Sequence, residues 1–279
     1  LLPLCFGAAT KFSQVSLDAD KRYTATLKLG VTTTTGDAEG EVLQTRPVTP
    51  EQVNADRIAQ ACERFTGPIE QVPPMHSALK HQGKALYEYA RAGIDIERPP
   101  RSVTLHRIDI LNWQGDVLEL DVQCSKGTYI RTLAQDIGEA LGCGAHLIGL
   151  RRTGSGGVRL DGAVTLEALM AMSEAERDAH LLPADILLND WPEVLLSEPE
   201  AARFLTGLRR RTSLADAPQV RVYGPHPEPG SHPDRRVLLG SAHIKGGELI
   251  PTRLLSPAEV EGMLTQSAPS AAVASASEI

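Results

Sequence analysis

The sequence contains no long apolar run and no secretion signal. No stretch of about 18 or more uninterrupted apolar residues, the length of a membrane-spanning helix, occurs in the chain. The opening residues, LLPLCFGAATKFSQ, lack a basic segment that leads into an apolar stretch and a cleavage site. We therefore expect a soluble, unsecreted protein of the cytoplasm.

Cysteine is scarce. The four cysteines, Cys5, Cys62, Cys124 and Cys143, are scattered along 279 residues. Disulfide-stabilised proteins are usually small and dense in cysteine, whereas a chain of this length with 42% hydrophobic residues can bury a substantial core without disulfides. The cysteines are expected to be reduced thiols, which fits the cytoplasm.

An excess of positive charge is also missing, since the formal net charge is -7. This total argues mildly against a nucleic-acid partner, but the distribution of charge is more informative than its sum. Between Arg203 and Arg221 there are five arginines and a single acid, Asp216. This stretch is either a solvated face or a surface for phosphates.

The motifs of several enzyme classes are absent. Cys143 and His146 have C-x-x-H spacing, but no second pair of ligands lies nearby to complete a zinc site. RRTGSGG, at residues 151–157, lacks the pattern of a phosphate-binding loop, and the chain has no G-x-S-x-G elbow. Metal binding, nucleotide hydrolysis and serine hydrolysis are therefore disfavoured.

Periodic patterns predict both strands and helices in the first part of the chain. Apolar and polar residues alternate over residues 21–30 and 117–124, as in half-buried strands. Thr49 and Pro50 predict the start of one helix, and Thr132 the N-cap of another that ends at Gly142. Two short helices are expected near residues 165–172 and 173–180.

Towards the C-terminus the sequence pattern changes from mixed helices and strands to short strands. Short strands are predicted at residues 219–223, 236–244 and 248–255, with KGGE as a hairpin connection between the last two. Without a regular βαβ rhythm, the fold class is α+β with a mixed or antiparallel sheet. We expect a catalytic domain over residues 1–190, a small β domain over 191–262 and a disordered Ala/Ser-rich tail over 263–279.

Aromatic and basic residues follow the ends of the predicted strands. Tyr23 begins one strand, Tyr129 and Arg131 follow another, and LRR (residues 150–152) comes after the next helix. Unstacked RNA bases are held by aromatic or apolar side chains, and their phosphates by lysine and arginine. Each residue taken singly also suits a structural role, and Tyr23 could be a core tyrosine.

Together these segments resemble a family, the TruB-type tRNA pseudouridine-55 synthases of bacteria. The segments that carry the resemblance are GAATKFSQ (7–14), DKRYTATLKLG (20–30), GDAEG (36–40), PPMHSALKHQGKALYEYARAG (73–93), CSKGTYIRTLAQDIGEALGCGAHL (124–147) and LRR (150–152). They occur in family order. The C-terminal strands resemble the small PUA-like RNA-binding domain of bacterial members.

The resemblance implies isomerisation of a uridine in the T-arm of tRNA to pseudouridine, without metal or organic cofactor. The family's nucleophile is an aspartate in a GxLDPxATG motif directly before the segment that begins at Leu1. That aspartate is not among these residues, and Asp37 already matches its own family position in GDAEG. Because the chain starts with Leu1 rather than methionine, we expect an N-terminally incomplete and inactive form of an active, monomeric enzyme.

Other roles carry over by motif. Tyr23 would stack on the extruded base, Tyr129 would line its pocket and Arg131 would pair with the absent aspartate. Leu150 would contact the nucleoside, and Lys126 and Arg151 would meet phosphates. Departures from the family pattern are His76, where tyrosine is usual, and Thr34, where aspartate is common.

Two rival hypotheses remain. The missing nucleophile, with the retained Tyr23, Lys126 and arginine cluster, also suits a non-catalytic RNA-binding or tRNA-folding protein. The other rival is a structural or interaction protein unrelated to RNA.

Overall fold

The computed structural model describes residues 1–225 and 236–266 of the chain. Two compact units make up the protein, each with its own core. The first comprises Leu1–Leu2 and Asp18–Ala163, and the second comprises Pro3–Leu17 and Val164–Ile279. The predicted domain limits at residues 190 and 262 stay a prediction, whereas the predicted α+β class with antiparallel pairing is confirmed.

A six-stranded antiparallel sheet forms the centre of the first unit, in the order β10-β9-β1-β8-β7-β4. Its strands are β1 (Lys21–Leu29), β4 (Gly67–Gln71), β7 (Arg101–Gln114), β8 (Val117–Cys124), β9 (Ala145–Ser155) and β10 (Val158–Arg159). The two alternating segments of the sequence are the neighbouring strands β1 and β8, as predicted. Apolar residues of one face, such as Leu27 and Leu120, are fully buried.

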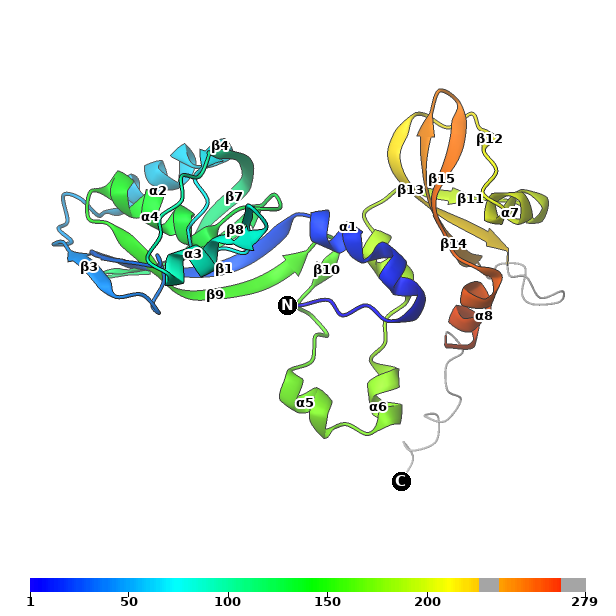
Figure 1. Cartoon of the computed structure of the whole chain (residues 1–279), viewed down its shortest axis with the longest axis horizontal. Coiled ribbons are helices and arrows are strands. Elements are labelled where there is room, and N and C mark those ends of the chain that lie inside the picture. Colours follow the sequence, from blue (N-terminus) through cyan, green and yellow to red (C-terminus); the bar gives the residue numbers. More distant parts are fainter. Residues whose placement is uncertain (226–235, 267–279) are drawn as a thin grey trace. The chain divides into compact units, whose positions relative to one another are not determined.

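Helices α2 (Ala55–Arg64) and α4 (Ile130–Leu141) pack against that face (Figure 1). Helix α4 buries Leu133, Ile137 and Leu141 and ends at Gly142 in the left-handed conformation, as its sequence predicts. Gly138 allows α4 to approach β9 closely, since a Cβ at this position would lie 2.2 Å from the Ala145 amide nitrogen. This contact fixes the height of the helix above the sheet.

The predicted starts of α2 and α4 are wrong. Helix α2 begins at Ala55 because the Asn54 side chain caps it by accepting a hydrogen bond from the Arg57 amide at 3.1 Å. Helix α4 begins at Ile130 with Tyr129, not Thr132, as N-cap. The Tyr129 amide is satisfied by Gln71 of β4, a partner that is 58 positions away in the chain and that no local pattern reveals.

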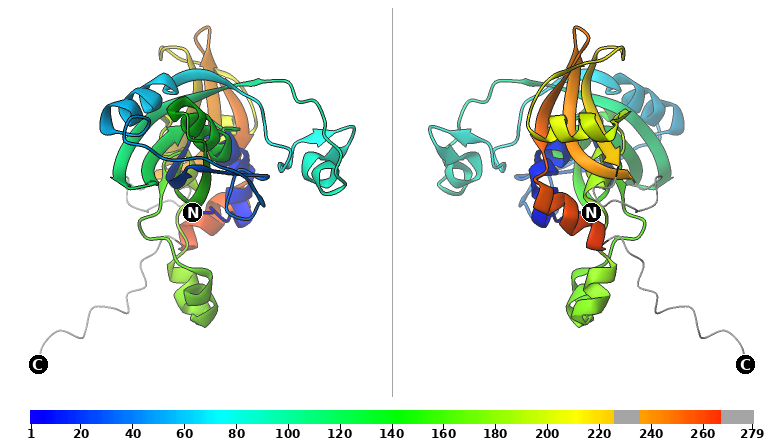
Figure 2. Two further views of the ribbon diagram at one scale, coloured as in Figure 1. Left: turned by 90° about the vertical axis from the view of Figure 1, so that its left-hand side faces the viewer. Right: turned by 90° about the vertical axis from the view of Figure 1, so that its right-hand side faces the viewer.

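Two small hairpins complete the first unit. One pairs β2 (Val31–Thr33) with β3 (Val42–Thr45). The other pairs β5 (Lys80–His81) with β6 (Lys84–Ala85) and leads into α3 (Leu86–Arg91). Residues 73–93, which we call the arm, extend away from the six-stranded sheet (Figure 2).

The second unit contains a five-stranded sheet in the order β11-β13-β14-β15-β12. Its strands are β11 (Glu193–Leu195), β12 (Arg210–Arg211), β13 (Ala217–Pro225), β14 (Arg236–Lys245) and β15 (Glu248–Leu254). The last three confirm the predicted strands, and Lys245 pairs with Glu248 across the expected hairpin. All pairs are antiparallel except β11 with β13.

The second unit also contains several short helices. They are η1 (Gly7–Phe12), α1 (Ser13–Asp18), α5 (Leu166–Ala171), α6 (Glu174–Ala179), η2 (Ala184–Leu188), α7 (Glu198–Leu205) and α8 (Pro257–Gln266). Both expected short helices are present: Thr165 caps α5, and a capping box of Ser173 and Glu176 begins α6. Helix α8 includes residues 263–266 of the predicted tail, and the rest of that tail lies outside the described residues. No helix in the described ranges is long and apolar enough to cross a membrane.

The N-terminal segment folds with the second unit. Phe12 is fully buried in a cluster with Leu188, Tyr223 and Val260. The Lys11 ammonium donates to the Leu254 carbonyl at 2.9 Å and pairs with Glu259 at 2.6 Å. This segment is therefore anchored by one aromatic side chain and one ion pair.

Replacing Phe12 by alanine should lower the free energy of unfolding of the second unit by about 3–5 kcal/mol, the usual cost of a cavity left by a buried aromatic ring. Phe6 is 64% exposed, so Phe6→Ala in the same segment should change it by less than about 0.5 kcal/mol. Chemical denaturation measures both. Equal effects of the two substitutions would show that Phe12 does not anchor the segment.

Candidate active site

Arg131, in the first turn of α4, binds two other segments of the first unit. Its Nη1 donates to Asp37 Oδ2 at 3.0 Å, and its Nη2 donates to the His76 carbonyl at 2.6 Å. The Arg131 side chain is 22% exposed, so its charge is largely removed from solvent. A loop near Asp37, the base of the arm at His76 and the start of α4 thus meet at one guanidinium.

The position of Asp37 is itself fixed. Thr35 Oγ1 donates to its carboxylate at 2.5 Å, and the Glu39 amide donates at 3.2 Å. The Leu147 amide of β9 donates to the carbonyl of the preceding Gly36 at 3.0 Å. Burial raises the pKa of Asp37, but the hydrogen bonds from Thr35 and Glu39 and the charge of Arg131 outweigh it, so that the pKa is lowered overall. The carboxylate is therefore ionised at neutral pH.

Tyr129 is held through its backbone. Gln71 is 2% exposed, and its side-chain amide accepts from the Tyr129 amide at 3.0 Å and donates to the Tyr129 carbonyl at 3.3 Å. This double contact places Tyr129 directly before the helix that carries Arg131. The spacing between the two predicted site residues is thereby rigid.

Tyr23 lies half-buried on β1 and packs against the core. Its cross-strand neighbour on β9 is Arg152, whose guanidinium carbon lies 5.9 Å from the centre of the phenol ring. Burial raises the pKa of Tyr23, and the charge and hydrogen bond of Arg152 oppose that shift only in part. Tyr23 is neutral at physiological pH and has both core contacts and a polar neighbour.

The remaining predicted residues are more exposed. Lys126 pairs with Asp18 at 2.8 Å, with 63% of its side chain exposed. Leu150, 49% exposed, lies opposite Ala25 on the same sheet face as Tyr23. Arg151 lies opposite Thr24 and therefore on the other face, because successive strand residues alternate.

The structure joins Arg131 to Asp37 and Tyr23 to Arg152, two pairs that the sequence patterns do not reveal. Asp37 was recognisable only as a member of GDAEG, and Arg152 only as the last residue of LRR. Gln71 carries no sequence signal at all. Pairings of this kind depend on segments far apart in the chain.

Two other features have structural explanations. All four cysteines are free thiols, and burial raises the pKa of Cys62 and of Cys124 to about 11. His146 is buried, with Nδ1 2.8 Å from the Val31 carbonyl. Among the described residues, no group of three or more histidine, cysteine or acidic side chains could hold a metal ion.

The arginine-rich stretch of the second unit is largely paired. Arg210 lies 2.5 Å from Glu200, Arg209 lies 3.6 Å from Glu248, and Arg221 lies 3.8 Å from Glu193. These contacts favour a structural role for three of the five arginines.

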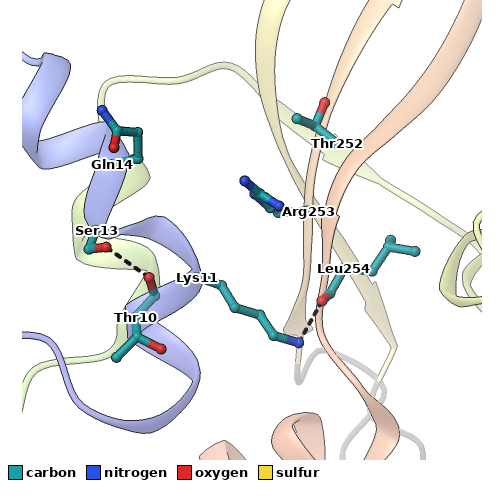
Figure 3. Close-up of a pocket in the computed structure, with 7 residues that line it drawn as sticks. All are labelled: Thr10, Lys11, Ser13, Gln14, Thr252, Arg253 and Leu254. Atoms are coloured by element: carbon teal, nitrogen blue, oxygen red, sulfur yellow. Dashed lines mark hydrogen bonds between the residues drawn. The ribbon is translucent and has the colours of Figure 1, made fainter.

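A groove of about 550 Å³ in the same unit separates η1 and α1 from β15 (Figure 3). It is lined by Thr10, Lys11, Ser13, Gln14, Thr252, Arg253 and Leu254. The Lys11 ammonium is already bound to Leu254 and Glu259, and the Thr10 and Ser13 hydroxyls donate to backbone carbonyls. Most donors of this groove are thus engaged within the protein.

Asp37→Asn should lower the free energy of unfolding of the first unit by about 1–3 kcal/mol at pH 7, because it removes the charged acceptor of Arg131. A carboxyl whose pKa is lower in the folded state stabilises the fold above its unfolded pKa. The difference between parent and variant should therefore shrink below about pH 4. Chemical denaturation at pH 7 and pH 3 measures it.

The matched control is Asp116→Asn. Asp116 pairs with Lys28 at 2.6 Å, but its side chain is 45% exposed. A solvent-exposed pair contributes at most about 1 kcal/mol. If Asp37→Asn cost no more than Asp116→Asn at pH 7, the Arg131–Asp37 pair would not stabilise the fold.

Comparison with known sequences covers most of the chain. The model of the family described as "TruB family pseudouridylate synthase (N terminal domain)" matches residues 1–130, and that of the "tRNA pseudouridylate synthase B C-terminal domain" matches residues 131–189. A relative from Ralstonia nicotianae named "tRNA pseudouridine synthase B" is 57% identical over 263 residues, which cover 91% of this chain and 81% of the relative. A relative of the same name from Verminephrobacter eiseniae is 53% identical over 268 residues, which cover 95% of this chain and 78% of the relative.

Solved structures show the same fold. The structure described as "Crystal Structure of a Cbf5-Nop10-Gar1 Complex" matches with a TM-score of 0.65 at 23% identity, and covers 93% of this chain and 74% of that one. The "Structure of H/ACA RNP bound to a substrate RNA containing 2'-deoxyuridine" matches with a TM-score of 0.60 at 20% identity, and covers 89% of this chain and 69% of that one. With the sequence relatives, these matches lead to one conclusion: the chain belongs to the TruB family of pseudouridylate synthases.

Proposed function

We propose that this chain is part of an enzyme that isomerises uridine 55, in the T-arm of tRNA, to pseudouridine. The family and the two relatives named tRNA pseudouridine synthase B support this reaction. The observation that carries it is the half-engaged guanidinium of Arg131. It is aimed by Asp37 and His76, yet Nε has no hydrogen-bond partner among the described residues and Nη2 makes a single bond.

These remaining donors suit a second carboxylate. An arginine offers five N–H groups in a planar fork, enough for Asp37, the His76 carbonyl and one more acidic side chain. The resemblance implies that the nucleophilic aspartate precedes Leu1. Arg131 would hold that carboxylate ionised and aimed at the sugar or the base, as covalent catalysis requires.

The reaction exchanges one glycosidic bond for another. The bond between N1 of uracil and C1' of ribose breaks, and a bond between C5 and C1' forms. The proton on C5 leaves and N1 acquires one, so the product has the same composition as the substrate and no redox cofactor is required. The protein's task is to hold the nucleophile and the detached base in place.

The first unit supplies side chains for this task. Tyr23 would stack on the extruded uracil, Tyr129 and Leu150 would line its pocket, and Lys126 and Arg151 would contact phosphates. The arm adds aromatic and basic groups, with the Lys84 ammonium 5.0 Å from the Tyr89 ring centre and the Arg91 guanidinium carbon 5.3 Å from that of Tyr87. Such mixed surfaces suit single-stranded RNA.

A second candidate function is RNA binding or tRNA folding without catalysis. It is favoured by the paired aromatic and basic side chains of the arm, which suit an RNA ligand whether or not turnover follows. The two functions share the RNA ligand and differ in turnover.

The test compares the 279-residue chain with one that includes the upstream residues encoded by its gene. Both should bind tRNA, and only the longer chain should release tritium from tRNA labelled at uridine C5. A tRNA with cytidine at position 55 is the control. The absence of tritium release from the longer chain would reject the enzymatic proposal, and failure of both chains to bind RNA would reject the two candidates together.

In the longer chain, Arg131→Ala should lower kcat by about 10²–10³-fold, the loss typical of removing one preorganised electrostatic group. The dissociation constant for tRNA should change by less than about threefold, because Arg131 faces a carboxylate rather than RNA. Arg159→Ala, an exposed substitution on β10, is the control. Full activity of Arg131→Ala would remove Arg131 from the mechanism.

A further inference from the structure

Arg152 is the one charged residue of LRR that shares a sheet face with Tyr23. The register between β1 and β9 pairs Arg22 with Gly154 and Tyr23 with Arg152, so that Thr153 has no partner. Such a β-bulge redirects the side chains next to it. On the other side of this bulge the register is regular, and alternation along β9 places Arg152 on the face of Tyr23 and Arg151 on the opposite face.

The contact between the two side chains is specific. The Arg152 guanidinium carbon lies 5.9 Å from the centre of the Tyr23 ring, and the two residues are paired across β1 and β9. A phenol rotates about two side-chain bonds, and packing of its ring against the core restrains only part of that motion. Attraction between the Arg152 guanidinium and the ring restrains the remaining motion.

Arg152 is placed at a cost to stability. Its Nε is buried and has no hydrogen-bond partner among the described residues. Arg152 also lowers the pKa of the nearby Lys21, although burial of Lys21 is the larger cause. A buried unpaired donor and a neighbouring like charge are both unfavourable, so stability alone does not explain an arginine here.

We propose that Arg152 is a positioning residue for Tyr23, and that its guanidinium holds the phenol in the orientation in which the ring stacks on the extruded target base. This rests on the proposed function for the role of the ring, but the coupling of the two side chains exists without RNA. Arg152 thus acts through Tyr23 and does not hold a phosphate. The two roles differ in what they do to RNA affinity.

The first experiment uses the 279-residue chain without RNA. The tyrosines are labelled as 3-fluorotyrosine, and the Tyr23 signal is assigned in the fluorine NMR spectrum by its loss in Tyr23→Phe. In Arg152→Met this signal should shift or broaden, while the signals of the other tyrosines and the spectrum of the control Arg159→Met stay unchanged. An unchanged Tyr23 signal in Arg152→Met would overturn the proposal.

The second experiment adds a T-arm RNA with 2-aminopurine beside the target uridine, whose fluorescence rises when the neighbouring base leaves the stack. At saturating protein, Arg152→Met should reduce this rise by about tenfold, the fold-change expected from losing a partly buried ring–cation contact. Affinity should stay within about twofold of the parent, and Arg152→Lys, which keeps the charge, should restore part of the signal.

Each alternative result has a definite meaning. If Arg152→Met instead weakened binding and reduced the dependence of log K on log salt by about one, Arg152 would be a phosphate contact and the proposal would be wrong. In the Tyr23→Phe background Arg152→Met should have little further effect, and full additivity would also overturn it. If the parent chain produced no fluorescence change, the proposed function would fail, and the NMR result alone would decide the coupling.

Discussion

The ion pair between Arg131 and Asp37 is the interaction on which the candidate site depends. It joins the first turn of α4 to a loop that is bound to β9, and the same guanidinium holds the base of the arm through the His76 carbonyl. The Arg131 and Asp37 side chains are 22% and 24% exposed, so solvent screens their attraction only partly. Three segments that are tens of residues apart in the sequence therefore meet at the Arg131 guanidinium. Displacement of the Asp37 loop or of α4 would leave this positive charge without its carboxylate partner.

Backbone packing also restrains the position of Arg131. Gly138 allows α4 to lie close to β9, and Gln71 binds both polar groups of the Tyr129 peptide at the start of the helix. The helix can slide or rotate little under these restraints. The Arg131 guanidinium, with N–H groups still unused, therefore has a fixed orientation. Electrostatic catalysis depends on charged groups that are oriented in advance in this way. On the neighbouring strands β1 and β9, the pairing register places Arg152 on the same sheet face as Tyr23.

Local patterns predicted much of the fold. Alternation identified β1 and β8 over nearly their full lengths, and Gly142 and the Ser173–Glu176 capping box marked helix ends correctly. The starts of α2 and α4 were wrong for different reasons. Asn54 rather than the nearby Thr49 caps α2, whereas the Tyr129 amide at the start of α4 is bound by a glutamine from a distant strand. The error for α2 was a choice between two nearby capping residues. The error for α4 could not be avoided from the local sequence, because the partner of its first residue lies in another strand.

The sequence by itself determined strands β1, β8, β13, β14 and β15, several helix ends, the α+β class and the family, because these follow from residue spacing and from motifs that are contiguous in the chain. Only the tertiary structure decided that Asp37 pairs with Arg131, that Arg152 rather than Arg151 lies beside Tyr23, and that Phe12 folds with the second unit. Such contacts join residues that are far apart in the sequence, with separations of 94 positions for Asp37 and Arg131 and 248 for Lys11 and Glu259. Their energies depend on distance and burial in the folded chain, and neither quantity is a property of a local segment.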